Sequence, residues 1–284
     1  MERPVAIVTG AGNGLGAAFV AEIGNSGFAV LVNNRCHADR PLSAQPVAAA
    51  VVAAGGIAAT DDHAVDAEGG PEAIVATALA QWGRLDALVL NAGISGPAVK
   101  VGQGDTALGP VMAINFFANT RLVEAALPHL RRSPAARIVF VSSTGGLHGV
   151  RGRSAYAASK GALIAYALSL AGELRRDGIF VNVLAPYAAT NMTAQPGRQP
   201  DPRMAPQGAA PICAWLASAA CDRTGEIWVA GGGHVRAARA MESEVAPYDP
   251  ATLARLARMP RARGYAGGEQ AYADFYVRAF GENE

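Results

Sequence analysis

The chain has little of what several classes of site and partner require. Its three cysteines, Cys36, Cys213 and Cys221, are odd in number and widely spaced, which fits neither a disulfide framework nor a zinc site. The five histidines show no metal-ligand spacing, so we expect no metal. The net charge is +1 and no basic stripe alternates with aromatic residues, which argues against nucleic acid as a partner.

Long apolar runs are also missing. No stretch reaches the ~18 apolar residues that a membrane span requires, so we expect no membrane partner. The N-terminus, from Met1 to Pro4, runs directly into a strand-like segment and leaves no room for a signal peptide. The cytoplasm is therefore the expected location. Hydrophobic residues make up 51% of the 284, which is enough for a large core in one or two domains.

Buried strand patterns and helix patterns alternate along the chain. Strand-like segments lie near residues 4–9, 28–33, 57–60, 86–90, 137–142, 179–185 and 226–230. Helix-like segments lie near residues 14–25, 43–54, 71–82, 106–132, 155–176 and 211–219. This alternation predicts an α/β fold with a doubly wound parallel sheet of Rossmann type, and a ligand beyond the carboxyl ends of its strands. We expect one catalytic domain, 1–235, followed by a helical extension, 236–284, which packs on that domain or on a neighbouring subunit.

A glycine-rich turn follows the first strand. The run from Thr9 to Gly16 reads TGAGNGLG, after the apolar segment VAIV and before a helix-like segment. In this context the glycines let the backbone approach a pyrophosphate, and the helix N-terminus supplies N–H donors. An ordinary tight turn is the alternative.

Tyr156 and Lys160 stand four residues apart in a helix-like segment, so their side chains share one face. An ammonium beside a phenol lowers the tyrosine pKa from ~10 and makes a proton donor or acceptor near neutral pH. Alone the pair is a weak signal. Asn91-Ala92-Gly93 and Ser142-Ser143, however, each close a later strand.

These motifs, in this order, resemble the short-chain dehydrogenase/reductase superfamily over roughly residues 4 to 233. The resemblance implies four catalytic residues. Tyr156 would be the general acid/base, Lys160 would lower its pKa and hold the nicotinamide ribose, and Ser143 would bond the substrate oxygen. Asn115, in the helix-like segment between, would support a proton relay to Lys160 through water.

The resemblance also implies a nicotinamide dinucleotide as cofactor. Its contacts would be Gly10, Asn13, Gly14, Leu15, Gly16, Asn34, Arg35, Asp66, Ala67, Asn91, Ala92, Gly93, Tyr156, Lys160, Pro186 and Thr190. Asn34 stands where NAD-specific members usually carry an Asp, and Arg35 offers a cationic fork to a 2′-phosphate. Asn34 can still bond a ribose hydroxyl and Arg35 can stack on adenine, so NADP and NAD both stay open, with NADP favoured. Tyr187 departs from the Pro-Gly that many members have.

Two irregular regions complete the sequence. Residues 193–211 contain five prolines and two glycines and by resemblance form a loop over the substrate, with a plain surface connection as the alternative. Beyond residue 233, a stripe of aromatic residues lies at helical spacing: Tyr272, Phe275, Tyr276 and Phe280. The tail and the run from Asn182 to Thr193 more loosely resemble the (3R)-hydroxyacyl-CoA dehydrogenase unit of peroxisomal multifunctional enzymes.

The sequence thus predicts an NAD(P)-dependent oxidoreductase that interconverts a secondary alcohol and a ketone, such as a 3-hydroxyacyl thioester or a steroid-like small molecule. The alternatives are a dihydrodiol or carbocycle dehydrogenase and a non-catalytic dinucleotide-sensing regulator. Ala- and Leu-rich faces at Ala162, Ile164, Ala165, Leu168 and Leu170 predict, with the family's four-helix interface, a homodimer or homotetramer.

Overall fold

The structure is a computed structural model of the whole chain. It describes residues 3–36, 43–190, 199, 201–247, 251–252, 256 and 263–264. The aromatic stripe predicted at 272–280 and most of the loop at 193–200 lie outside the described residues. The chain divides into two compact units, Met1–Arg236 and Ala237–Glu284. In the second unit, β9 (Met241–Glu242) pairs antiparallel with β10 (Arg263–Gly264).

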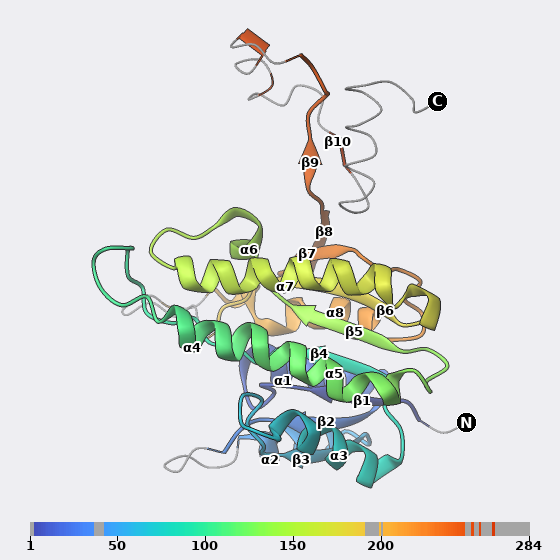
Figure 1. Cartoon of the computed structure of the whole chain (residues 1–284). Coiled ribbons are helices and arrows are strands. Elements are labelled where there is room, and N and C mark those ends of the chain that lie inside the picture. The colour runs from blue at the N-terminus through green and yellow to red at the C-terminus, as the bar shows by residue number, and fades with distance from the viewer. Residues whose placement is uncertain are drawn as a thin grey trace, which may run out of the picture. The chain divides into compact units, whose positions relative to one another are not determined.

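The chain forms an eight-stranded sheet in the order β3-β2-β1-β4-β5-β6-β7-β8, of which β1 to β7 lie in the first unit (Figure 1). The strands are β1 (Val5–Val8), β2 (Ala29–Asn33), β3 (Ile57–Asp61), β4 (Ala87–Leu90), β5 (Arg137–Val141), β6 (Phe180–Pro186), β7 (Ile227–Gly231) and β8 (His234–Ala238). Strands β1 to β7 pair in parallel. The chain winds outward from β1 to β3 and then crosses back to β4, so the topological switch point lies between β1 and β4. The predicted doubly wound Rossmann-type sheet is confirmed.

Strand β8 was not predicted. Gly232 and Gly233 connect it to β7, and their positive φ values of 56° and 76° suit the tight two-residue turns that join hairpin strands. A connection this short can join only antiparallel strands, so β8 closes the sheet at its β7 edge.

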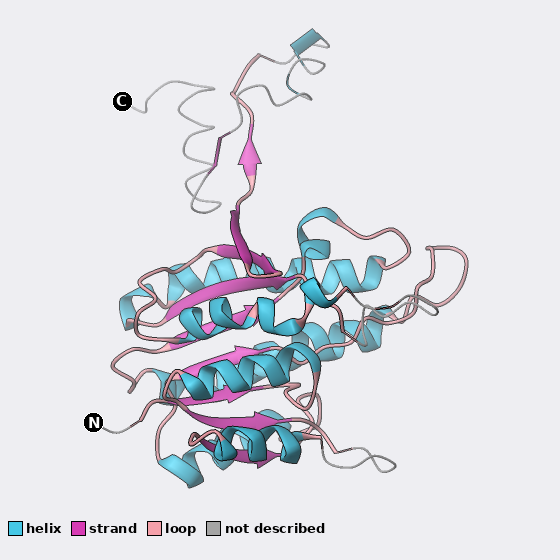
Figure 2. Cartoon of the chain, turned by 180° about the vertical axis from the view of Figure 1, so that it is seen from behind, coloured by secondary structure: helices cyan, strands magenta, loops and turns pink. Residues whose placement is uncertain are grey.

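Helices cover both faces of the sheet. They are α1 (Gly14–Asn25), α2 (Ala44–Ala53), α3 (Gly70–Trp82), α4 (Leu108–Met112), α5 (Ala118–Leu130), α6 (Thr144–His148), α7 (Ser154–Glu173) and α8 (Ala210–Ala217). One layer contains α1, α2 and α8, and the other contains α3, α5 and α7 (Figure 2). Short 3₁₀ turns lie at Arg175–Asp177, Pro202–Met204 and Pro206–Gly208. No helix among the described residues is long and apolar enough to cross a membrane.

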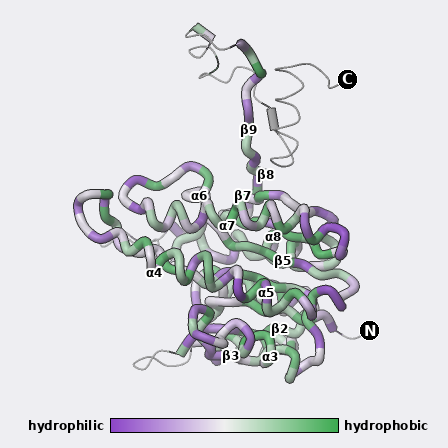
Figure 3. Tube along the Cα trace, viewed as in Figure 1, coloured by the Kyte–Doolittle hydropathy of each residue, from purple (hydrophilic) through white to green (hydrophobic). Residues whose placement is uncertain are grey.

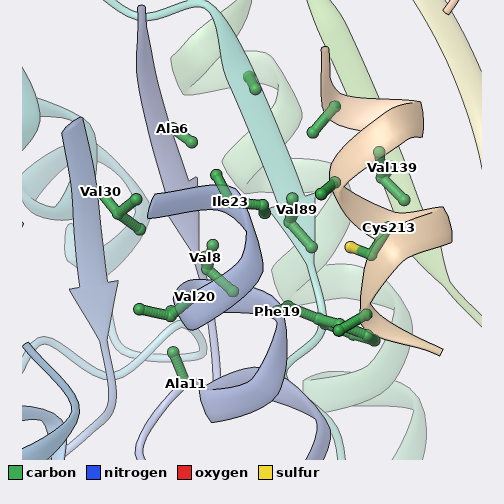
Figure 4. Close-up of a cluster of buried hydrophobic side chains, with 14 of the residues drawn as sticks. Ala6, Val8, Ala11, Phe19, Val20, Ile23, Val30, Val89, Val139 and Cys213 are labelled. Carbon is green, nitrogen blue, oxygen red and sulfur yellow. The ribbon is translucent and has the colours of Figure 1, made fainter. Parts of the chain in front are cut away.

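The core explains why the strands are continuous apolar runs. All four residues of β1 and all five of β2 are buried, as a parallel sheet covered on both faces requires. On the α1 and α8 side, Phe19 and Ile23 pack with Val8, Val89 and Cys213 (Figure 4). Each large side chain that is fully buried contributes about 1.5–3 kcal/mol. Hydrophobic residues follow the central strands, and the connections carry most of the hydrophilic ones (Figure 3).

Candidate active site

The turn between β1 and α1 depends on residues that lack a side chain. Gly10 and Gly14 have φ values of 61° and 54°, a region that L side chains rarely adopt. A Cβ on Gly16 would run into the backbone of Gly10 and Ala11. The glycine motif therefore forms the tight strand-to-helix turn that the sequence predicted.

The first turn of α1 is not capped by the side chain that precedes it. Asn13 is the N-cap residue, in an extended conformation, and its side chain makes no capping hydrogen bond. The first N–H groups of a helix have no partner within it and carry the positive end of its dipole. Gly14, Leu15 and Gly16 thus fit the pyrophosphate of a dinucleotide. A Cβ on Gly14 would lie 3.6 Å from the Thr190 methyl group and would occupy part of the space between Thr190 and the first turn of α1.

Thr9 and Asn91 join the ends of β1 and β4 at the switch point. The Thr9 hydroxyl accepts hydrogen bonds from the N–H groups of Asn91 (3.1 Å) and Ala92 (3.0 Å). The Asn91 amide donates to the carbonyl oxygens of Thr9 (2.9 Å) and Gly10 (3.1 Å). The Asn-Ala-Gly motif is therefore tied directly to the glycine turn, 81 to 83 residues away in the sequence.

Asn34 lies just beyond β2 and contacts the same turn. Its Oδ1 accepts from the Gly12 N–H at 3.3 Å, and its Nδ2 donates to Ser43 Oγ at 2.8 Å. A Cβ on Gly12 would clash with both of these side chains. Arg35 follows and is exposed. The end of β2 therefore presents the amide of Asn34 and the guanidinium of Arg35. A carboxylate at this position would repel the 2′-phosphate of NADP, and neither of these groups does so.

The other predicted cofactor contacts lie in connections or strand ends at this edge of the sheet: Asp66, Ala67, Pro186 and Thr190. The Asp66 carbonyl accepts a hydrogen bond from Arg121 at 3.4 Å. Tyr187, the departure from the family pattern, is held by a hydrogen bond from its N–H to the Ala230 carbonyl at 2.7 Å. Tyr187 is 42% exposed, so it does not fill the core.

The two predicted catalytic hydroxyl side chains lie close together. Ser143 is the N-cap residue of α6, and its Oγ accepts from the Gly145 N–H at 3.0 Å. A Cβ on Gly145 would lie 3.3 Å from Ser143 Oγ and 3.7 Å from a ring carbon of Tyr156, which is in the first turn of α7. Ser143 is accordingly one of the groups that lower the pKa of the Tyr156 phenol.

Lys160 is buried behind this pair. Its Nζ donates to the Val141 carbonyl at 2.8 Å, and the Ser142 hydroxyl donates to the Lys160 carbonyl at 2.8 Å. A Cβ on Gly93 would lie 3.5 Å from Nζ, so a glycine there leaves space beside the ammonium. Burial lowers the pKa of Lys160 to about 8.

The expected effect of Lys160 on Tyr156 is not found in this arrangement. The Lys160 Nζ lies 6.0 Å from the centre of the Tyr156 ring. Burial raises the pKa of Tyr156 above its ordinary value, while the hydrogen bond with Ser143 and the charge of Arg153 act in the opposite direction. The phenol is therefore protonated at neutral pH and is able to donate a proton.

Asn115 lies in a π-helical turn, Ala113–Phe117, between α4 and α5. Its buried Oδ1 accepts from the Ile94 N–H at 2.7 Å, and its Nδ2 donates to the Ile94 carbonyl and to Ser159 Oγ, both at 2.9 Å. Ser159 in turn donates to the Tyr156 carbonyl at 2.8 Å. The Asn115 side chain thus braces the catalytic helix, and its role in a proton relay stays a prediction.

Sequence reasoning missed four residues at the site, all of them small and polar: Thr9, Ser142, Ser159 and Asn119. The Asn119 Nδ2 donates to the main-chain carbonyl of Asn115 at 2.7 Å. Its buried Oδ1 has no partner among the described residues. For Asn119 the available signal was an asparagine inside an apolar helix pattern, because asparagine is a poor helix former.

Comparison with known proteins agrees with this geometry. Residues 4–201 match the family model for short chain dehydrogenases. The chain is 32% identical over 252 residues to a short-chain type dehydrogenase/reductase of Mycobacterium tuberculosis, across 86% of this chain and 88% of that protein. It is also 32% identical to the peroxisomal hydratase-dehydrogenase-epimerase of Neurospora crassa, across 81% of this chain but 26% of that longer protein.

A solved structure matches most of the chain. The crystal structure of a short chain dehydrogenase from Mycobacterium avium has a TM-score of 0.79 and 31% identity, and the match covers 92% of this chain and 96% of that one. The fold, the motif residues and these relatives agree. The chain belongs to the short-chain dehydrogenase/reductase family of oxidoreductases.

Proposed function

We propose that the protein interconverts a secondary alcohol and a ketone. The observation that supports this most directly is the pairing of the Ser143 and Tyr156 hydroxyls in front of the buried Lys160. A nicotinamide dinucleotide, when bound, exchanges the hydride with the substrate carbon. The protein supplies the proton and the orientation.

In the reducing direction, the protonated phenol of Tyr156 donates its proton to the carbonyl oxygen. Ser143 hydrogen-bonds the same oxygen and stabilises the charge that develops on it. Lys160, whose Nζ lies 6.0 Å from the centre of the Tyr156 ring, would hold the nicotinamide ribose when the cofactor is bound. In the oxidising direction, the phenolate takes the proton of the alcohol, so the same groups serve both reactions.

NADP is the proposed cofactor. The amide of Asn34 and the exposed Arg35 at the end of β2 support this choice, because neither repels a 2′-phosphate and a guanidinium can bind one through two hydrogen bonds. The similarity to a peroxisomal protein that contains a dehydrogenase supports 3-hydroxyacyl thioesters as the first substrates to try. Steroid-like ketones are the next class.

The test is a panel of ketones and secondary alcohols assayed with both cofactors at the nicotinamide absorbance band. The panel includes acetoacetyl thioesters, a steroid ketone and a dihydrodiol. Reduction of a ketone would support the proposal. Turnover of the dihydrodiol alone would favour the carbocycle dehydrogenase, and cofactor binding without any turnover would favour a dinucleotide-sensing regulator.

A further inference from the structure

A half-buried arginine stands next to the catalytic tyrosine in the sequence. Arg153 is the N-cap residue of α7, outside its helical backbone, and stands three residues before Tyr156. The connection that carries it is tightly turned, because Gly149 and Gly152 have positive φ values of 74° and 76°. The Arg153 N–H donates to the Val150 carbonyl at 3.0 Å, which holds the end of this turn.

Arg153 lacks an acidic partner in the part of the chain that the structure describes. The segment from Ser143 to Lys160 contains Arg151 and Arg153 but no Asp or Glu. Elsewhere in the protein Arg84 and Arg131 each contact a carboxylate at 2.8 Å, whereas the Arg153 side chain makes no such contact with a described residue. A cation that is partly removed from water without a counter-ion is unfavourable unless a ligand brings the anion.

The charge of Arg153 also reaches the reacting phenol. Burial raises the pKa of Tyr156, and the charge of Arg153 is one of two influences that lower it. Geometry places the same turn at the two hydroxyls. A Cβ on Gly145 would lie 2.8 Å from the Val150 side chain, 3.3 Å from Ser143 Oγ and 3.7 Å from a ring carbon of Tyr156. The turn that Arg153 closes therefore packs beside the point where Tyr156 and Ser143 would bind a substrate oxygen.

We propose that the substrate carries an anionic group, a carboxylate or a phosphate, and that Arg153 binds this group. The inference rests on the proposed ketone and alcohol chemistry at Tyr156. A guanidinium suits the task because its fork of donors matches both anions in a bidentate geometry. The anion belongs either to the substrate itself, as in a keto acid, or to a phosphate-bearing carrier such as coenzyme A.

Two matched pairs of ketones separate charge from shape. Acetoacetate is compared with its neutral methyl ester, and acetoacetyl-coenzyme A with the neutral N-acetylcysteamine thioester. Dissociation constants are measured by calorimetry with the protein saturated with oxidised cofactor, so that no ketone is consumed. The variants are Arg153→Gln, Arg153→Lys and, as the matched control on the exposed neighbour, Arg151→Gln.

We expect the wild-type protein to bind the anionic member of at least one pair ten or more times more tightly than the neutral member. Arg153→Gln should remove that preference and leave binding of the neutral member unchanged, Arg153→Lys should keep part of it, and Arg151→Gln should keep all of it. The Arg153 side chain makes no capping bond, so the unfolding midpoint should not change in Arg153→Gln. The pair that shows the preference identifies the source of the anion.

Equal binding of charged and neutral members by the wild-type protein would overturn the proposal, as would an equal loss in Arg151→Gln. If Arg153→Gln lowered the turnover of charged and neutral ketones equally, Arg153 would act only on the pKa of the Tyr156 phenol. That result would also overturn the proposal. Turnover is measured separately with reduced cofactor. An anion preference without turnover would contradict the proposed function but not the anion site.

Discussion

At the scale of single residues, burial acts in opposite directions on two groups four positions apart. It lowers the pKa of Lys160 to about 8 and raises the pKa of Tyr156, because burial disfavours the charged form of each group. The charged form of lysine is the protonated one, whereas the charged form of tyrosine is the deprotonated one. The helix spacing of the pair was readable from the sequence. The direction of the tyrosine shift was not, since it depends on elements far away in the chain that enclose the phenol.

Tyr156→Phe should lower kcat at least 100-fold and leave the cofactor dissociation constant nearly unchanged, because only the proton-transferring oxygen is removed. Steady-state kinetics and cofactor fluorescence titration measure the two effects. Tyr166→Phe is the matched control on the same helix, where the ring packs edge-on against Phe116 and Phe140. Near-normal activity of Tyr156→Phe would contradict the assignment.

Arg35→Ala should weaken NADPH binding about tenfold or more and change NADH binding little, because an arginine–phosphate contact contributes about 1.5–3 kcal/mol. Asn34→Asp should act in the same direction by introducing a charge that repels the 2′-phosphate. Fluorescence titration with both cofactors measures the effects. A wild-type preference for NADH, or an equal loss for both cofactors, would show that the end of β2 does not select NADP.

At the scale of elements, the strand positions and most helices were predictable, because each depends on a local apolar pattern. The helix expected at 106–132 instead consists of α4, a π-helical turn and α5. Nothing in the local pattern signals this turn. The buried side chain of Asn115, within this turn, makes hydrogen bonds with Ile94 and Ser159, which are distant in the sequence.

Two glycines test how closely α6 and α7 must approach. A Cβ on Gly146 would lie 2.6 Å from the carbonyl carbon of Lys160, so Gly146→Ala should destabilise the protein and displace the catalytic lysine. Gly172 lies within α7 with nothing near its Cβ position, so Gly172→Ala should raise the free energy of unfolding by about 0.5–1 kcal/mol. Urea unfolding and kcat measure both. Full activity in Gly146→Ala would refute the close packing.

Asp86 links three segments at the opposite edge of the sheet. It accepts hydrogen bonds from Arg84 (2.8 Å), Ser133 (2.6 Å) and the Val5 N–H (2.8 Å). Burial alone would raise the pKa of Asp86, but these hydrogen bonds outweigh it, so the pKa lies below 3.8. The stabilisation is complete above the unfolded-state pKa and is lost as the pH falls through the lower, folded-state value.

Asp86→Asn should therefore lower the free energy of unfolding at neutral pH by about 1–3 kcal/mol and weaken its dependence on pH below about 4. Urea unfolding at several pH values measures this. Asp177→Asn is the control, because its ion pair with Arg131 is more exposed and should contribute less than about 1 kcal/mol. Equal effects of the two substitutions would show that the buried network has no special weight.

At the scale of the whole molecule, part of one face of α7 and its neighbours is not covered by the residues that the structure describes. Ala165 is exposed and Phe117 is 52% exposed, although Ile164 and Leu170, also expected on this face, are buried within the chain. We propose that a second copy covers this face, in a homodimer or homotetramer. Small residues allow the close helix approach that a self-complementary two-fold contact needs.

Light scattering at micromolar concentration should give a multiple of the 29.0 kDa chain mass. Ala165→Glu should dissociate the particle, because it places charges in the contact without touching the core. Ala53→Glu, at an exposed position of α2, should leave the assembly intact. A wild-type particle of single-chain mass would refute the interface.

The sequence by itself determined the alternation of strands β1 to β7 with most of the helices, the glycine turn and the motif residues at the carboxyl ends of β1, β4 and β5. These features depend on local patterns of apolar and small residues. Only the tertiary structure decided that Ser143 lies beside Tyr156, that the Asn91 amide donates to the glycine turn and that the Arg153 side chain makes no ion pair with a described residue. Hydrogen bonds across 80 residues, and the burial that shifts the two catalytic pKa values, exist only once the chain has folded.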